Sequence, residues 1–505
     1  MSNFKSYLKN HWIKMVLWFM IVSYILYFSI FTILRSQNLY AHYFDLGIMH
    51  QTLYNTFEAI KTGDYSRFLE MTNPHGIEQM KRMAIHNDPI LAFLAIFYFI
   101  YSGPETLLVI QSIVLGIGAF AVFSIVEEVL KKNQKKNIMG LFFAFSYLMY
   151  TPMQRANIYE FHAVTLATTF LLFMYYFWLK KKNWLCLIFL CFSLLTKEQV
   201  GLSTLFFGIY IYYIETKKRI VQFKTIQFNL FPIIIIGISV VWFVVSMLII
   251  IPLARGGNHF ALSYYSDFGN SPSSIFLGIL KHPGSLKKYI FHIDTVRYFL
   301  FLLGPLGFLS LLSPFLFVIT LPQFAINLLS NSWNMRNIIF HYTSVIQPFV
   351  YISAIYGTKK VLDYFSRFKK KRYLFYLFVI CLFVICLLFS YFKGPLPFSR
   401  EADLYPLKKT NEAKSEIIEW SNRLKNPDLK ISSTGSLAPY FTSRRYYYHF
   451  PSGYERADFV VVKKDELYNY FDSSIDIMGV YKRLIKDTHF TIIYNSKLVV
   501  VYKKI

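Results

Sequence analysis

The chain has 505 residues, of which 55% are hydrophobic and 19% aromatic, and it carries a formal net charge of +25. Long apolar segments fill most of the first 392 residues, which excludes an ordinary soluble enzyme and predicts membrane-spanning helices. The basic residues cluster between these segments, so they indicate membrane topology and anionic lipid rather than nucleic acid.

The N-terminal segment is predicted to be the first span. Lys5, Lys9 and Lys14 lie before or at the start of an apolar run that reaches Leu34, and no small-residue cleavage site is seen. This pattern is typical of a signal anchor that is retained. Because basic residues favour the cytoplasmic side, we place the N-terminus in the cytoplasm.

A polar segment follows, and residues 35–104 are predicted to form the first outer loop, with interfacial helices. Within it, the apolar run Pro89–Tyr101 has 13 residues, which is short for a span and suits a re-entrant or interfacial helix. If this run does not cross the membrane, the positive-inside rule is satisfied. All later basic clusters then fall on the cytoplasmic side, namely residues 131–136, 180–182, 217–219 and 359–372.

This choice predicts an α-helical polytopic protein of the cell membrane with about eleven transmembrane helices and the C-terminus outside. Residues 1–392 are assigned to the transmembrane domain. The predicted spans start near Met15, Glu105, Ile138, His162, Trp184, Val200, Phe228, Tyr298, Phe315, Tyr342 and Tyr373.

The composition changes in residues 393–505, which carry Gly394-Pro395 and mixed charges. The sequence KSEIIEWSNRL predicts an amphipathic helix, and ISSTGS, ADFVVV and TIIYNSKLVVVY predict strands. Asn495-Ser496 indicates a hairpin turn in the last of these segments. We therefore expect a small α/β domain outside the cytoplasm, and it shows no glycine pattern for nucleotide binding.

With this topology, the ionisable residues other than the basic clusters gather at the outer ends of the helices. Ionisable groups at membrane depth are costly and usually line a functional cavity. The candidates are Asp45 in HYFDLG, His86 and Asp88 in HNDP, Arg155, Glu160 and His162 in QRANIYEFH, Lys197 and Glu198 in TKEQ, and Arg336 and His341 in WNMRNIIFHY.

Each candidate also has a purely structural interpretation. Asp45 and Asp88 each precede an apparent helix and could be N-caps. Lys197 and Glu198 could form a local ion pair, or the lysine could extend to the interface. The others could be interfacial or loop residues in water.

Several motifs, taken in order, resemble a known family. FDLG is followed by an H-x-x-P motif that opens a short apolar helix, then by IYEFH and LLTKEQ, and the block LPQFAINLLSNSW…HYTSVIQPF completes the pattern. This order resembles the prokaryotic membrane family DUF2079 (domain of unknown function) over most of the chain. The usual H-x-S-P is H-N-D-P here, and F-H-P-E is F-H-A-V, so one carboxylate of the family is missing.

That family is similar to the GT-C glycosyltransferases, such as protein mannosyltransferases and lipid A aminoarabinose transferases. The resemblance implies a GT-C-like fold and use of a sugar linked to polyprenyl phosphate, at the outer membrane face. GT-C enzymes carry an acidic residue early in the first outer loop, and Asp45 occupies that place.

Glycosyl transfer from a lipid phosphate needs a base for the acceptor and cations for the leaving phosphate. The hypothesis makes Asp45 the base or a metal ligand, with Asp88 and Glu160 as further carboxylates. Lys197 and Arg336 hold the phosphate and Glu198 orients Lys197, while Arg155 and His341 complete the binding set. His86, Asp88 and His162 are candidate ligands of a divalent metal, Mg²⁺ or Mn²⁺.

Two other classes of function stay open from the sequence. A transporter or flippase for a lipid-linked or anionic substrate predicts inverted repeats and charges at mid-membrane. A non-catalytic membrane scaffold predicts that Asp45 and Lys197 are dispensable. The sugar and the acceptor are not specified by any motif.

Overall fold

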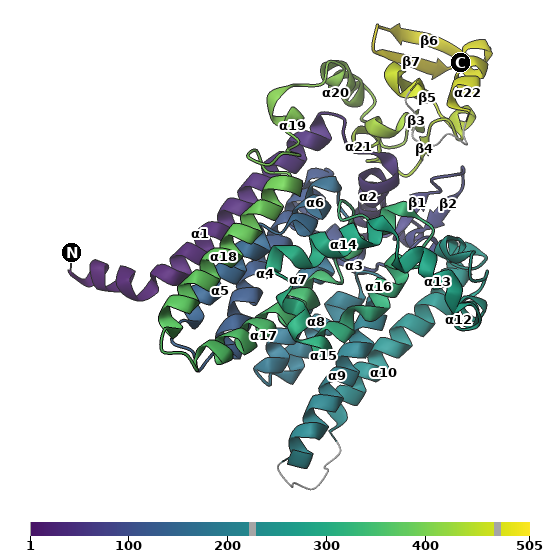
Figure 1. The fold of residues 1–505 in the computed structure, drawn as a ribbon. Helices are drawn as coiled ribbons and strands as arrows, with labels where there is room; N and C mark the ends of the chain where they lie inside the picture. The colour runs from purple at the N-terminus through teal and green to yellow at the C-terminus, as the bar shows by residue number, and fades with distance from the viewer. Residues whose placement is uncertain (1, 222–228, 469–475) are drawn as a thin grey trace.

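The chain folds mainly into helices, with one small sheet near its C-terminus (Figure 1). The computed structural model describes residues 2–221, 229–468 and 476–505, except the side chains of residues 2–10 and 218–221. This confirms the predicted polytopic helical architecture with a small C-terminal α/β region.

Four helices of the described residues are long and apolar enough to cross a membrane. They are His11–Gln37 within α1 (Ser2–Gln37), α4 (Glu105–Val129), the helix Leu230–Arg255 that comprises α10 (Leu230–Val245), η5 (Ser246–Ile250) and α11 (Ile251–Arg255), and α18 (Lys371–Lys393). The shorter apolar helices are α3 with η4 (Ile90–Phe99), α7 (Ala163–Leu179), α8 (Asn183–Leu194) and α15 to α16 (Pro314–Leu328). The other helices before residue 393 are α2 (Ile48–Thr62), α5 (Lys136–Leu148), α6 (Thr151–Tyr159), α9 (Val200–Val221), α12 (Pro272–Lys281), α13 (Pro283–Ile290), α14 (Ile293–Leu303) and α17 (Gln347–Phe365).

Most predicted spans coincide with a helix, although the count of eleven stays a prediction. The expected start near Phe228 lies outside the described residues. The starts near Tyr298 and Tyr342 fall inside α14 and before α17, respectively. Proline explains the second shift, because Pro348 lies in the first turn of α17, where its fixed φ angle favours a helix start.

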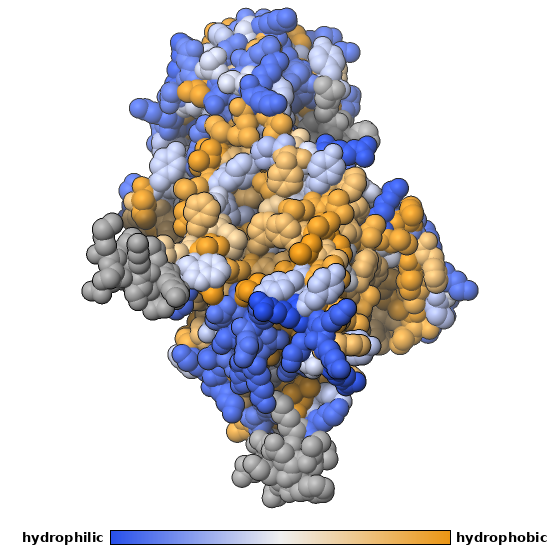
Figure 2. Space-filling view, turned by 60° about the vertical axis from the view of Figure 1, so that its left-hand side comes forward, coloured by the Kyte–Doolittle hydropathy of each residue, from blue (hydrophilic) through white to orange (hydrophobic). Residues whose placement is uncertain are grey.

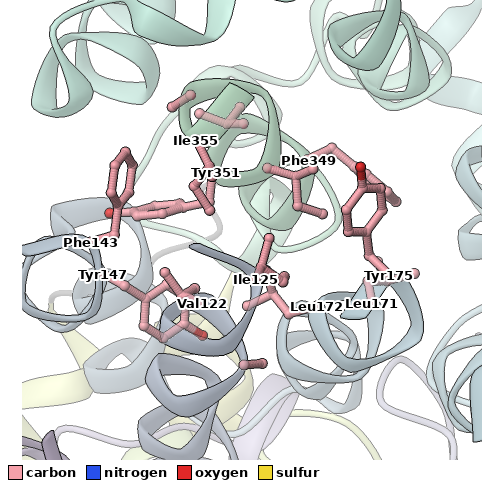
Figure 3. Packing of buried hydrophobic residues seen from close by; sticks show 14 of the residues in the cluster. Val122, Ile125, Phe143, Tyr147, Leu171, Leu172, Tyr175, Phe349, Tyr351 and Ile355 are labelled. Carbon is pink, nitrogen blue, oxygen red and sulfur yellow. The ribbon is translucent and has the colours of Figure 1, made fainter. Parts of the chain in front are cut away.

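The main core lies between α4, α5, α7 and α17 and consists mainly of aliphatic and aromatic side chains (Figure 3). Tyr147, Leu171 and Tyr351 are among its fully buried side chains. The helices approach closely at Gly118, where a Cβ atom would lie 2.3 Å from the Tyr147 hydroxyl. Small residues permit such contacts between membrane helices, where packing replaces the hydrophobic effect as the main attraction.

Two of the loops that carry basic clusters contact neighbouring helices at one end of the bundle. Lys135 Nζ donates to the Tyr376 hydroxyl at 2.6 Å, and Lys180 Nζ lies 3.2 Å from Glu128. Figure 1 shows this end opposite the C-terminal sheet. In Figure 2 a broad hydrophobic band lies between two hydrophilic ends, as expected for a protein that sits in a membrane.

The C-terminal sheet has five strands in the order β4-β3-β5-β7-β6 among the described residues. The strands are β3 (Ile431–Ser433), β4 (Tyr447–His449), β5 (Phe459–Lys463), β6 (Phe490–Asn495) and β7 (Val499–Lys504), and the helices of this part are α19 (Tyr405–Lys408), α20 (Lys414–Arg423), α21 (Ala438–Phe441) and α22 (Ile477–Lys486). β3 pairs in parallel with β4 and β5, and β7 is antiparallel to β5 and β6. The predicted helix at 414–424 and the hairpin between β6 and β7 are both present.

The first outer loop and the C-terminal sheet share a hydrophobic core. Leu39, Tyr43 and Ile48 are buried in one cluster with Ile417 and Tyr447. The rings of Tyr43 and Tyr447 have centroids 4.7 Å apart. This loop also forms the hairpin of β1 (Glu70–Thr72) and β2 (Gln79–Lys81). The predicted boundary between two domains at residue 393 stays a prediction. Residues from both sides of this boundary share one core, so the two regions stabilise each other.

Acidification should destabilise this junction, because His50 is buried there as a neutral ring. Its two nitrogens contact Tyr98 Oη at 2.8 Å and Ser443 Oγ at 2.9 Å, and burial lowers its pKa from 6.5 to about 3. Below pH 6.5 the unfolded chain binds a proton at His50 that the folded chain does not bind. From pH 7 to pH 5 we expect this histidine alone to cost about 2 kcal/mol of unfolding free energy.

The measurement is the stability of the detergent-solubilised protein between pH 7 and pH 5. His50→Gln should reduce the pH dependence, whereas His489→Gln, at an exposed histidine, should leave it unchanged. Equal pH dependence in wild type and His50→Gln would contradict the assignment.

Candidate active site

A cavity of about 600 Å³ lies between the first outer loop, the start of α7, the turn between α8 and α9, and the segment after α11. It is a suitable size for a small organic ligand. Its charged and histidine side chains are Asp45, His75, Arg82, His86, Asp88, His162, Lys197, Glu198, Arg255, His259 and His341. Aromatic rings at Phe44, Phe260, Tyr264, Tyr265 and Tyr342 also line it.

Asp45 lies in a single π-helical turn, η1 (Tyr43–Gly47), at the start of α2. Glu160 holds this turn, because its carboxylate accepts from the backbone N–H of His42 at 3.0 Å and of Leu46 at 2.7 Å. Glu160 is buried and is not among the residues that line the cavity. It therefore positions the turn that carries Asp45.

Asp45 pairs with His162, with 2.9 Å between Oδ1 and Nε2. Burial raises the pKa of Asp45. The charge and hydrogen bond of His162, together with a hydrogen bond from Tyr159, lower this pKa by more than burial raises it, so the net pKa is below its usual value. The carboxylate is therefore ionised at neutral pH and can accept a proton. Its side chain caps neither η1 nor α2, so the N-cap interpretation is not seen.

Asp88 forms a buried bidentate ion pair with Arg82. Arg82 Nε lies 3.1 Å from each carboxylate oxygen, and Nη2 lies 2.8 Å from Oδ2. Both side chains are about 5% exposed or less. Burial raises the pKa of Asp88 above its usual value, so this carboxylate depends on its arginine partner. Asp88 does not cap α3.

Lys197 is a buried ammonium that faces the cavity. Within the described residues it has no hydrogen bond or ion pair, and its Nζ lies 5.9 Å from the Tyr342 ring centroid. Burial lowers its pKa, an effect opposed by the charges of Glu198, Asp88 and Asp45. A cation in this state is available to an anionic ligand.

Glu198 is occupied by groups other than Lys197. Its Oε1 lies 3.0 Å from His86 Nδ1 and 3.3 Å from His259 Nε2, and its Oε2 accepts from the backbone N–H of Asn87 at 3.0 Å. The local ion pair that the sequence left open as an alternative for Lys197 and Glu198 is therefore not formed.

The remaining predicted residues divide into two groups. His341 lines the cavity, where its ring stacks on His162 at 3.7 Å between centroids. Arg155 instead binds the C-terminal end of α18, donating to the carbonyls of Lys393 and Gly394 at 2.8 and 3.2 Å. Arg336 lies over the Tyr289 ring, outside the cavity lining.

The structure thus brings together seven of the ten predicted residues: Asp45, His86, Asp88, His162, Lys197, Glu198 and His341. His75, Arg82, Arg255 and His259 also line the cavity but were not predicted. A signal existed for Arg255 and His259, since ARGGNHF lies at the end of a long apolar segment.

The sequence matches a family model over residues 35–482, and its description is Predicted membrane protein (DUF2079). The chain belongs to this family. The match covers both the loop that carries Asp45 and three strands of the C-terminal sheet, β3, β4 and β5. It agrees with the four long apolar helices and identifies the chain as a membrane protein.

Two solved structures are similar to the chain at 11% sequence identity, both of ArnT from Cupriavidus metallidurans. The structure bound to undecaprenyl phosphate has a TM-score of 0.46 and covers 96% of this chain and 98% of its own. The apo structure has a TM-score of 0.44 and covers 91% and 93%, respectively. No curated protein matches the chain.

Proposed function

We propose that the protein is a membrane glycosyltransferase that moves a sugar from a polyprenyl-phosphate-linked donor to an acceptor at the outer face of the cell membrane. The observation that carries the proposal is that an ionised carboxylate, Asp45, and a buried ammonium without an ion-pair partner among the described residues, Lys197, line the same cavity. Aromatic rings in the same wall suit the faces of a sugar. The resemblance of the DUF2079 family to GT-C enzymes supports the same class of reaction.

In the proposed reaction the acceptor hydroxyl attacks the anomeric carbon of the donor. Asp45 takes the proton from that hydroxyl as the new carbon–oxygen bond forms. The bond between the anomeric carbon and the phosphate oxygen breaks, and polyprenyl phosphate leaves with the electron pair. Lys197 stabilises the negative charge on the leaving phosphate. A base and leaving group on opposite faces of the sugar give inversion at the anomeric carbon.

The test is transfer of labelled sugar from a set of polyprenyl-phosphate donors by the protein in proteoliposomes. Lipid-linked donor should be consumed and free polyprenyl phosphate should appear in equal amount. If well-folded protein consumes no donor of the set but moves it across the bilayer, the flippase alternative replaces the proposal.

Lys197 should control donor binding. Lys197→Gln removes a charge-assisted contact to phosphate, which is worth about 1.5–3 kcal/mol, so the KM for donor should rise about 10- to 150-fold. Lys197→Arg should retain part of the affinity because it keeps the charge. Steady-state kinetics measure both, with Lys287→Gln at an exposed lysine as the matched control. An unchanged KM in Lys197→Gln would remove this residue from the site.

The proposed sidedness places the basic clusters inside and the cavity outside. Cysteines at Lys132 and Asn270, both exposed positions, test it with a membrane-impermeant maleimide on intact cells. Labelling is expected at position 270 and not at 132. The opposite pattern would invert the topology and place the cavity in the cytoplasm.

A further inference from the structure

One carboxylate in the cavity wall has two imidazole neighbours on the same oxygen. His86 Nδ1 and His259 Nε2 lie 3.0 and 3.3 Å from Glu198 Oε1. These three atoms lie within 4.8 Å of one another, which leaves room for one ion between them. Two donors held about 2.0–2.1 Å from one metal are themselves separated by about 3.0–3.4 Å.

The three side chains come from segments that are distant in the sequence. His86 precedes α3, Glu198 lies in the turn between α8 and α9, and His259 follows α11. The Glu198 and His259 side chains are 4% exposed. The Asn87 N–H fixes the second oxygen of Glu198, and the Asn87 side chain donates to Ser246 Oγ at 2.7 Å. A backbone donor that orients a ligating carboxylate is a common feature of metal sites.

We propose that His86, Glu198 and His259 bind one divalent transition-metal ion of the zinc class in the wall of the cavity. Two imidazoles and one carboxylate match the ligand set of zinc sites that keep an open position, whereas Mg²⁺ prefers oxygen ligands and water. This set shares only His86 with the predicted set of His86, Asp88 and His162. Asp88 is paired with Arg82, and His162 with Asp45.

One hydrogen bond must change when the metal binds. His259 Nδ1 accepts from the backbone N–H of Ala261 at 3.0 Å, which keeps the ring proton on Nε2. Coordination through Nε2 moves that proton to Nδ1, so the Ala261 N–H loses its acceptor. The affected backbone belongs to the short segment η6 (Phe260–Tyr265), which contains no long helix to disrupt.

The test is zinc binding by the full chain, purified in detergent without a histidine tag. The protein is stripped with EDTA, incubated with ZnCl₂, desalted and analysed by mass spectrometry for metal. Wild type should retain about one zinc ion per chain, and zinc should raise its melting temperature. His86→Gln and His259→Gln should each lower zinc affinity at least about 10-fold.

The matched control is His75→Gln, which removes a histidine of the same cavity that lies outside the cluster. Variants are compared only where their size-exclusion profile equals that of wild type, and Glu198→Gln provides a third test of the same site. If wild type retains no more zinc than His86→Gln, His259→Gln and Glu198→Gln, the proposal is overturned. The cluster is then a carboxylate hydrogen-bonded to two histidines and not a metal site. Equal zinc loss in His75→Gln would also overturn it. The result does not depend on glycosyl transfer, because metal content is measured without substrate.

Discussion

Replacing Asp45 with asparagine is expected to lower kcat about 100- to 10,000-fold, which is the usual contribution of a general base. Asparagine keeps the shape of the side chain but cannot accept a proton from the acceptor. The turn η1 should keep its conformation in this variant, because the hydrogen bonds that fix its backbone go to Glu160 and not to Asp45. Transfer of labelled sugar in proteoliposomes measures the effect, and donor binding should change little.

Asp64→Asn provides the matched control for this result. Asp64 lies in the same outer loop, its side chain is 48% exposed, and its nearest hydrogen-bond partner is Ser66. It should therefore transfer sugar at the wild-type rate. Wild-type kcat in Asp45→Asn, or an equal loss in Asp64→Asn, would eliminate Asp45 as the base.

The largest effect on stability is expected at Arg82. Arg82→Met leaves the buried Asp88 carboxylate without a partner, and breaking such a pair costs about 3–5 kcal/mol. The apparent melting temperature of the detergent-solubilised protein should fall accordingly. Asp88→Asn in the same chain removes the stranded charge and should restore part of the loss.

Arg423→Gln is the control for removing an arginine from an ion pair. Arg423 pairs with Glu419, and their side chains are 59% and 56% exposed, so the melting temperature should not change measurably. If Arg82→Met is as stable as Arg423→Gln, the buried pair does not stabilise the outer loop.

Much of the site could be predicted because ionisable residues next to apolar spans are few. Asp45 was identified by its place in the predicted first outer loop, and Lys197 and His162 by their place at the predicted outer ends of spans. All three line one cavity. The same criterion included Arg155 and Arg336, because position along a chain does not reveal the direction of a side chain. Their partners, such as the carbonyls at the C-terminal end of α18, are distant in the sequence.

Contacts between distant segments could not be predicted in this way. Arg82 precedes Asp88 by six residues in an irregular loop, where no periodicity links them. His259 meets Glu198 only through the packing of the helix Leu230–Arg255 against α9. Four strands of the C-terminal sheet, β3, β5, β6 and β7, lie in segments that were predicted from their residue types and turn signals, whereas β4 was not predicted. The core that this sheet shares with Tyr43 depends on tertiary packing.

The central claim is that the cavity receives the phosphate of a polyprenyl-linked donor beside Asp45 and Lys197. A cryo-electron microscopy structure of the protein with undecaprenyl phosphate tests this most directly. We expect phosphate density within hydrogen-bonding distance of Lys197 Nζ, with the lipid tail leaving the cavity toward the hydrophobic band. Lipid phosphate bound elsewhere, with the cavity unchanged and Lys197 without a new partner, would contradict the account.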